Sequence, residues 1–315
     1  MTRLSATRPV VHGILNLNKT QVDTSMNMVR QVKRWTRVKR VGHAGTLDPI
    51  ATGVLPICFG QATRLMEFLV NGTKLYRAEF MLGVATDTYD AYGTTVSEAD
   101  WTSVTRSQVE ALLPSFVGTI QQQPPMYSAL KREGKRLYEL ARAGVEVERP
   151  TREVTVYRLT LLEWAPPLIT VEAECGRGFY MRSLAHDLGH ALGCGAHLSN
   201  LTRLRAGPMR IEESVTPQEF EEAVNKDEWE ELLQPPDAAL VAMPPVAVES
   251  SAERLLRNGQ AVSLLSAGVY VRHLESRRAY TAQGHFLAVV RFNRAQNRWQ
   301  PEKLFDLPIP SPYAP

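Results

Sequence analysis

The sequence predicts an α+β protein that ends in a second, smaller β unit. Helix-like and strand-like segments are mixed without the regular β-α-β rhythm of a doubly wound sheet, which favours an α+β arrangement. The length of 315 residues suggests about two domains, and 44% hydrophobic against 22% charged residues provides enough apolar material for a sizeable core. The same balance excludes a mainly disordered chain, a collagen and a coiled coil.

Apolar spacing and end signals predict three of the helices. Thr24 or Ser25 can cap a helix that runs to about Arg37, with one apolar face and one basic face. A second helix is expected at residues 61–70. A third covers about 180–192 and closes at Gly193, a residue type that favours helix ends.

Two further helices are predicted by capping boxes. Residues 107–110 read Ser-Gln-Val-Glu, and the helix that they begin is stopped by Pro114. Residues 216–219 read Thr-Pro-Gln-Glu, with Pro217 at the first helical position, where proline is favoured.

Strands are expected where apolar and polar residues alternate, at 74–84, 153–163 and 168–175. Residues 121–150 follow neither pattern. They contain Gln-Gln-Gln-Pro-Pro and then a basic cluster, so we expect an irregular, exposed insertion.

The C-terminal part is expected to be a separate β domain. Residues 234–248 are rich in Pro and Ala, as linkers often are, which divides the chain into 1–248 and 249–315. Short strands are expected at 261–264, 268–274 and 286–293, followed by a loose Pro-rich tail.

Charge is distributed unevenly along the chain. Residues 1–40 contain nine bases and one acid, whereas residues 212–231 contain nine acids and one base. The first stretch suits a polyanion and the second repels one, although either could be an ordinary solvated face. Charge alone therefore makes nucleic acid a candidate partner, which would contact 30–40 and avoid 212–231.

The sequence favours a cytoplasmic protein. Residues 1–10 contain no apolar core of a secretory signal, and no run approaches the roughly 20 apolar residues that span a bilayer. The three cysteines are widely spaced and lack a C-x-x-C pair, which argues against a disulfide framework or a thiolate zinc site.

The most constrained segment is 42–56, which reads Gly-His-Ala-Gly-Thr-Leu-Asp-Pro-Ile-Ala-Thr-Gly-Val-Leu-Pro. Pro49 biases Asp48 away from helical backbone, and Gly53 permits a positive φ. The pattern indicates one carboxylate, that of Asp48, on a rigid loop between apolar residues. A simple Asp-Pro turn is the alternative.

This segment resembles the catalytic motif of the TruB family, the bacterial tRNA pseudouridine synthases. Further matches follow in order over about residues 11–210: His-Gly-Ile-Leu-Asn-Leu-Asn-Lys at 12–19, Lys-Leu-Tyr-Arg at 74–77, Pro-Met-Tyr-Ser-Ala-Leu-Lys at 125–131, Gly-Arg-Gly-Phe-Tyr-Met-Arg at 176–182 and Gly-Cys-Gly-Ala-His-Leu at 193–198. Two departures are Asn18-Lys19-Thr20, where the family usually has Asp-Lys-Pro, and Ala44, where it often has Thr.

The resemblance implies a pseudouridine synthase fold, with a mixed, largely antiparallel sheet, an RNA-clamping insertion at about 121–150 and a C-terminal PUA-like domain. It implies an isomerase that flips uridine 55 out of the tRNA T-loop, breaks its glycosidic bond and rejoins the base through C5. Asp48 would be the nucleophile, at C6 of the base or at C1′ of the ribose. Arg182 would be its ion-pair partner, and Tyr76 would stack on the uracil and assist proton transfer.

The resemblance also implies substrate-binding residues. Tyr180 and Leu201 would line the pocket, and His43 would fill the space that the extruded base leaves. Phosphates would be held by basic side chains, namely Lys19, Lys33, Arg34, Arg37, Lys131 and Lys135. No cofactor and no guide RNA are expected, and the protein is expected to be a monomer that binds the tRNA T-arm.

Two patterns imitate metal sites. His186 and His190 are spaced as in a zinc helix, with His197 or Cys194 as the only further ligand candidates, and residues 87–93 imitate part of a calcium loop. Both lack a complete ligand set, so no metal is expected.

Two other functions remain open from the sequence. One is an RNA-binding or tRNA-folding protein on the same scaffold, without essential catalysis. The other is a guide-RNA-dependent pseudouridine synthase.

Overall fold

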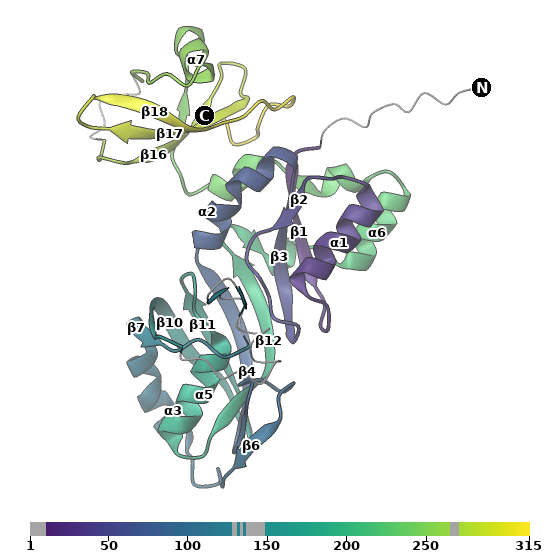
Figure 1. The fold of residues 1–315 in the computed structure, drawn as a ribbon, viewed down its shortest axis with the longest axis vertical. Coiled ribbons are helices and arrows are strands. Elements are labelled where there is room, and N and C mark those ends of the chain that lie inside the picture. Colours follow the sequence, from purple (N-terminus) through teal and green to yellow (C-terminus); the bar gives the residue numbers. More distant parts are fainter. Residues whose placement is uncertain (1–10, 128–130, 133–134, 137–148, 265–270) are drawn as a thin grey trace.

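The structure is a computed structural model that describes residues 11–127, 131–132, 135–136, 149–264 and 271–315. It has the predicted α+β class, with a large mixed sheet and a separate four-stranded sheet near the C-terminal end. Figure 1 shows the small sheet at one end of the long axis, beyond α2 (Met66–Asn71). In the part of the chain that is described, no helix is both long and apolar enough to cross a membrane.

The large sheet is assembled from strands that are distant in sequence. Its neighbours run in the order β14-β1-β3-β12-β4-β11-β10-β7, with β2 beside β3 and β13 beside β12. The strands are β1 (Gly13–Lys19), β2 (Val41–His43), β3 (Ala51–Phe59), β4 (Lys74–Leu82), β7 (Gly118–Gln122), β10 (Arg152–Ala165), β11 (Leu168–Cys175), β12 (Ala196–Ala206), β13 (Met209–Arg210) and β14 (Leu233–Gln234).

Shorter elements and helices surround this sheet. The two-stranded pairs are β5 (Val84–Thr86) with β6 (Thr95–Glu98), and β8 (Lys131–Arg132) with β9 (Lys135–Arg136). The remaining helices are α1 (Ser25–Thr36), α3 (Arg106–Leu112), α5 (Met181–Leu192), α6 (Pro217–Asn225) and α7 (Ser250–Arg257).

One parallel pairing brings the constrained loop to the middle of the sheet. Among the described pairings of the large sheet, β3 with β12 is parallel and the others are antiparallel, and Gly53 lies opposite Arg203. Gly53 has φ +96°, and a Cβ there would lie 2.3 Å from the carbonyl oxygen of Arg203. Glycine is required at this close approach, which confirms the predicted positive φ.

Local end signals placed several elements correctly. Thr24 caps α1 by accepting from the N–H of Asn27, and Arg37 closes this helix in the left-handed region. Gly193 closes α5 in the same region, with φ +78°. The predicted strands 153–163 and 168–175 correspond to β10 and β11, whereas residues 61–70 form a 3-10 turn (Gly60–Leu65) before α2.

The predicted capping box at 107–110 was wrong. Thr105 is the N-cap of α3: its hydroxyl accepts from the N–H of Gln108, and the Gln108 side chain accepts from the N–H of Thr105. Ser107 lies inside the helix, so two overlapping patterns competed and the earlier one prevailed. The second box, at Thr216 and Glu219, is as predicted.

This assignment can be checked by stability measurements. Thr105→Ala is expected to lower the free energy of unfolding by about 1 kcal/mol, because the cap bond is lost. Ser107→Ala, the matched control inside the helix, is expected to leave it unchanged. Chemical denaturation of both variants measures the difference, and a larger loss for Ser107→Ala would contradict the assignment.

The segment expected to be a linker is packed in part. Residues 236–240 form a buried 3-10 turn (Pro236–Leu240), and β15 (Pro245–Ala247) joins the small sheet. Asp237 is fully buried and accepts hydrogen bonds from the hydroxyls of Tyr280 (2.6 Å) and Ser311 (2.5 Å). Residues 241–244, in contrast, are mostly exposed and connect this turn to β15.

The small sheet was predicted only in part. Its order is β15-β16-β17-β18, with β16 (Ser276–Tyr280), β17 (Phe286–Asn293) and β18 (Arg298–Leu304). The strand at 286–293 is as predicted. The segment 261–264 contributes only an isolated bridge from Val262 to Trp299, and the described residues 271–274 are not a strand.

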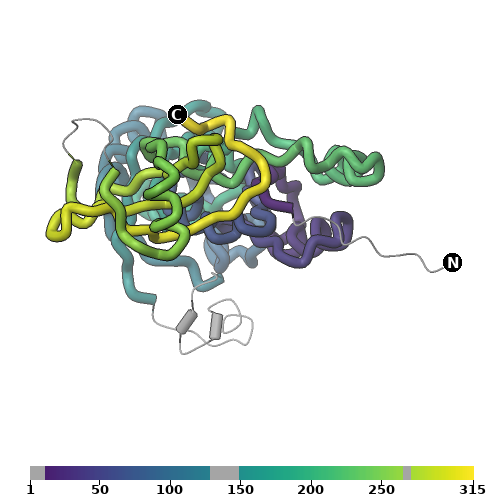
Figure 2. Tube along the Cα trace, turned by 90° about the horizontal axis from the view of Figure 1, so that it is seen from above, coloured from purple at the N-terminus to yellow at the C-terminus, as the bar shows by residue number. Residues whose placement is uncertain are grey.

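The two units share one apolar cluster, which we call the shared cluster. Aromatic residues of the small sheet and its C-terminal end pack on the 3-10 turn Gly60–Leu65, on α2 and on the turn 236–240 of the main unit. Figure 2 shows the small sheet stacked over that unit. Arg64 also lies over the Phe305 ring, 4.9 Å from its centroid. The shared cluster includes Ala62, Leu65, Leu69, Leu240, Tyr280, Phe286, Val289 and Phe305.

Candidate active site

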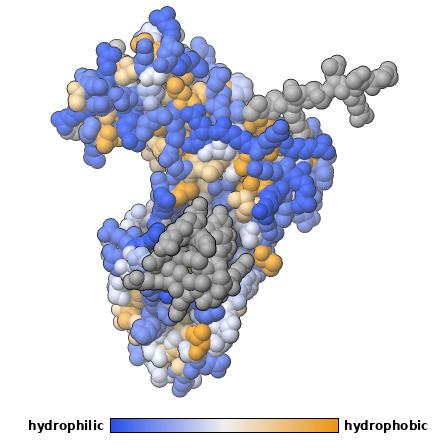
Figure 3. All heavy atoms as spheres, viewed as in Figure 1, coloured by the Kyte–Doolittle hydropathy of each residue, from blue (hydrophilic) through white to orange (hydrophobic). Residues whose placement is uncertain are grey.

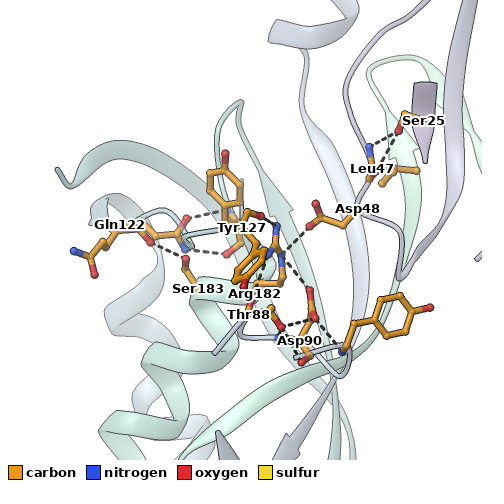
Figure 4. A network of polar contacts seen from close by, with 12 residues as sticks. Ser25, Leu47, Asp48, Thr88, Asp90, Gln122, Tyr127, Arg182 and Ser183 are labelled. Carbon is orange, nitrogen blue, oxygen red and sulfur yellow. Dashed lines mark hydrogen bonds and ion pairs between the residues drawn. The ribbon is translucent and has the colours of Figure 1, made fainter. Parts of the chain in front are cut away.

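The site is organised around a buried arginine. Arg182 lies in the first turn of α5, and its side chain is 3% exposed. Its Nε donates to Oδ2 of Asp48 at 2.9 Å, and its Nη2 donates to the carbonyl oxygen of Tyr127 at 2.8 Å. Figure 4 shows the guanidinium between these partners. The expected pair of Asp48 and Arg182 is thus brought together from residues 134 positions apart.

A second carboxylate, that of Asp90, also lies beside Arg182. Oδ2 of Asp90 lies 3.7 Å from Nε of Arg182, and the carbonyl of Thr88 accepts from Nη1 at 3.3 Å. Oδ1 of Asp90 is held by the Thr88 hydroxyl at 2.7 Å and by the N–H of Tyr92 at 3.0 Å. The segment 87–93, which imitates part of a calcium loop in sequence, therefore positions a charged partner for Arg182.

Asp48 is the accessible member of this group. Its side chain is 32% exposed, against 10% for Asp90. Its loop is fixed from both sides, because Ser25 at the start of α1 exchanges two hydrogen bonds with the backbone of Leu47, and the Asp48 carbonyl accepts from the N–H of Ala51. A substrate can therefore reach the carboxylate of Asp48, while the guanidinium of Arg182 that balances its charge stays buried.

Tyr76 lies on β4, in register with Arg203 of β12. Burial raises the pKa of Tyr76, whereas the charge and hydrogen bond of Arg203 act in the opposite direction and the nearby Asp48 carboxylate raises it further. The phenol is consequently neutral at pH 7. Arg203 itself is buried and donates to the carbonyls of Val54 (2.7 Å) and Gly45 (3.0 Å), so it braces the loop that carries Asp48.

Two other expected pocket residues lie on β12 and β2, two strands that both pair with β3. Leu201 is buried on β12, opposite Ala51 on one side and Ala78 on the other. His43 ends β2, and burial, followed by the charge of Arg203, lowers its pKa. His43 is therefore a neutral ring at pH 7.

The expected phosphate contact of Lys19 does not fit the structure. Lys19 is fully buried, and its Nζ donates to the carbonyls of Thr20 (2.8 Å), Asp23 (2.7 Å) and Pro49 (3.5 Å). Burial lowers its pKa to about 8, although the carboxylates of Asp23 and Asp48 act in the opposite direction. Lys19 thus ties the loop after β1 to the loop that carries Asp48.

The structural role of Lys19 predicts that its loss and the loss of exposed Lys33 have different effects. Lys19→Met should slow a single turnover at least about tenfold, because misplacement by about 1 Å is costly in catalysis. It should leave the salt dependence of tRNA binding unchanged. Exposed Lys33→Met should instead reduce the log–log salt slope by about one unit, as the loss of one phosphate contact does. Filter-binding titrations measure the salt slopes, and quench experiments measure the turnover rates. A reduced slope for Lys19→Met would show that Lys19 does contact a phosphate.

The other basic residues lie apart from Asp48. Lys33, Arg34 and Arg37 are exposed on the last turns of α1 and at its end. The acidic helix α6 packs beside α1, with the rings of Trp35 and Phe220 6.2 Å apart, so the basic and the acidic helix are adjacent in the fold. Lys131 and Lys135 belong to the β8–β9 pair, but their side chains lie outside the described residues.

One of the two histidines that are spaced as in a zinc helix makes an aromatic stack. His186 stacks on Tyr89, with centroids 3.9 Å apart and an interplanar angle of 14°. Among the residues that the structure describes, no three His, Cys, Asp or Glu side chains are grouped to hold a metal ion. The stack supports the loop that carries Asp90.

Residues that sequence reasoning missed are Asp90, Arg203, Gln122 and Ser25. One signal was present: a cation at a helix N-terminus is unfavourable for the helix dipole and calls for compensating carboxylates. That argument required a partner for Arg182 without identifying Asp90. Together these groups can hold one ionised, accessible carboxylate beside a neutral phenol, which suits nucleophilic attack coupled to proton transfer.

The family models and the relatives that match this chain all carry the name of one enzyme family. Residues 33–181 match the model of "TruB family pseudouridylate synthase (N terminal domain)", and residues 182–241 match "tRNA pseudouridylate synthase B C-terminal domain". A tRNA pseudouridine synthase B from Dehalococcoides mccartyi is 41% identical over 300 residues, covering 95% of this chain and 98% of the relative. Another from Symbiobacterium thermophilum is 51% identical over 209 residues, or 65% and 70% of the two chains.

Solved structures agree on the fold. A chain in the crystal structure of a Cbf5-Nop10-Gar1 complex superposes with a TM-score of 0.71 at 25% identity, covering 96% of this chain and 87% of that one. A chain in an H/ACA ribonucleoprotein bound to a substrate RNA gives 0.72 at 24% identity, with the same coverage.

Proposed function

The chain belongs to the TruB family of pseudouridylate synthases, and from this membership we propose that it converts uridine 55 in the T-loop of tRNA to pseudouridine. Pseudouridine is an isomer of uridine, so the reaction needs no redox partner and no group donor. The observation that carries the proposal is the ion pair between exposed Asp48 and buried Arg182 within the matching motifs.

Asp48 is the nucleophile in this proposal. Removal from water favours the neutral form of a carboxyl group, so an adjacent cation is needed to keep the nucleophile ionised. Arg182 supplies that cation at 2.9 Å, and Asp90 holds Arg182 from the other side at 3.7 Å. The attack is at C6 of the base or at C1′ of the ribose. On either route the N1–C1′ bond breaks and a C5–C1′ bond forms.

Neighbouring side chains supply the remaining steps. Tyr76 stacks on the uracil and helps to move the C5 proton, its phenol oxygen being oriented by the Arg203 guanidinium. Leu201 gives the pocket an apolar wall, and neutral His43 occupies the space that the flipped base leaves. Tyr180, at the start of α5, lines the same pocket. Base flipping is the general solution where an enzyme must reach an atom inside a stack.

RNA is held outside the pocket by basic side chains and by the C-terminal unit. Residues 249–306 contain nine bases and five acids, which supports the proposal of a PUA-like RNA-binding domain at 249–315. The surface is hollowed between the small sheet and the far half of the main unit, as Figure 3 shows. A tRNA arm in this hollow would meet both units.

The deciding experiment uses an unmodified tRNA transcript and the purified protein without other RNA. Pseudouridine mapped at position 55 supports the proposal. Tight binding without product would favour an RNA-binding or tRNA-folding protein, and product that forms only with added guide RNA would favour a guide-dependent enzyme. Either of these results would overturn the proposal.

A further inference from the structure

Gln122 is a buried polar residue that the reaction does not use directly. It ends β7, an edge strand of the large sheet, and is 2% exposed. Its Oε1 accepts from the N–H of Tyr180 at 2.8 Å, and its Nε2 donates to the carbonyl of Tyr180 at 3.0 Å. One side-chain amide thus makes the pair of hydrogen bonds that a neighbouring strand would make to residue 180.

These bonds fall at the start of the helix that carries Arg182. Tyr180 is the N-cap of α5, has extended backbone, and makes no side-chain cap bond of its own. Its carbonyl also accepts the first helical hydrogen bond, from the N–H of Leu184. The direction in which α5 leaves residue 180, and hence the position of Arg182 two residues later, depends on how Tyr180 is held.

The residues after Gln122 contact the same helical turn. The carbonyl of Gln123 accepts from the hydroxyl of Ser183 at 2.7 Å, and the carbonyl of Tyr127 accepts from Nη2 of Arg182 at 2.8 Å. Figure 4 shows these contacts on one side of the guanidinium and Asp48 on the other. Three attachments, at residues 180, 182 and 183, therefore join the segment 122–127 to the start of α5.

We propose that Gln122 is a positioning residue for catalysis, which acts by fixing Tyr180 so that Nε of Arg182 faces the Asp48 carboxylate. This inference rests on the function proposed above for Asp48 and Arg182. Gln122 touches no reacting atom. Its role is to hold the cation at the distance that keeps the nucleophile ionised and aimed.

The test compares Gln122→Met with Gln121→Met. Methionine has nearly the same length as glutamine but forms no amide hydrogen bonds, and it tolerates burial. Gln121 is the preceding residue of β7 and is exposed, so it is the matched control. Single-turnover rates with excess protein, tRNA dissociation constants and thermal unfolding are measured for both variants and for the wild type.

We expect Gln122→Met to slow the single turnover at least about tenfold while the dissociation constant changes less than about threefold, because misplacement acts on the reacting geometry rather than on RNA contacts. Gln121→Met should match the wild type. Gln122→Glu retains the acceptor toward Tyr180 N–H and should give an intermediate rate.

A Gln122→Met protein that is folded and as fast as Gln121→Met would overturn the inference. So would a rate loss accompanied by an equal loss of binding, which indicates general loosening of the structure. If Gln122→Met does not fold, Gln122→Glu decides by the same measurements. A wild type without activity would instead refute the proposed function, so the two failures are distinguishable.

Discussion

Asp48→Asn is expected to abolish pseudouridine formation, by at least about four orders of magnitude in the single-turnover rate, the scale on which loss of a nucleophile acts. Asparagine preserves the shape of the side chain but removes its charge and its nucleophilic oxygen. The fold should persist, because Arg182 keeps Asp90 as a charged partner and the carbonyls of Thr88 and Tyr127 as acceptors.

Binding separates this effect from misfolding. The dissociation constant for tRNA should stay near the wild-type value, because Asp48 makes no phosphate contact in the proposed complex. Rapid quench with radiolabelled transcript measures the rate, and filter binding measures affinity. Product above the uncatalysed background would remove Asp48 from the role of nucleophile.

Arg182→Met should have the second largest effect, on both activity and stability. It leaves the carboxylates of Asp48 and Asp90 near each other without their cation. Removing one partner of a buried ion pair typically costs about 3–5 kcal/mol of unfolding free energy. Turnover should fall to background, since the nucleophile loses the group that keeps it ionised and oriented.

Arg177→Met is the matched control from the same motif. Arg177 is exposed and bonds to the side chain of Asn71, so its loss should change the unfolding free energy by less than about 0.5 kcal/mol. Urea denaturation of the two variants makes the comparison. Equal stabilities would show that Arg182 is not the buried centre of the site.

Sequence signals succeeded where a few adjacent residues decide the structure. Thr24 and Gly193 mark the ends of their helices, and the alternation at 168–175 marks β11. The motifs also identified Asp48 and Arg182, whose contact the geometry reproduces. The box predicted at 107–110 was wrong because an overlapping box at 105–108 was also available, and the helix begins at that one.

The misses share a different cause, namely contacts between distant residues. Strand β16 contains Arg277 and Arg278, which break the apolar alternation of a buried strand. They are accommodated because Arg277 lies 5.1 Å from the centroid of the Trp299 ring and Nε of Arg278 donates to the carbonyl of Met243 at 2.8 Å. Similarly, the burial of Lys19 depends on a carbonyl 30 residues away, which no local pattern reveals.

The shared cluster has a mechanical consequence. Because Tyr280, Phe286 and Phe305 complete a core that Leu65 and Leu69 begin, the two units should melt cooperatively rather than one after the other. The entropic cost of aligning them is then incurred during folding and not when a ligand arrives. The distance between the two units is then fixed in the free protein. An RNA that touches both units must match this distance, which was set before binding.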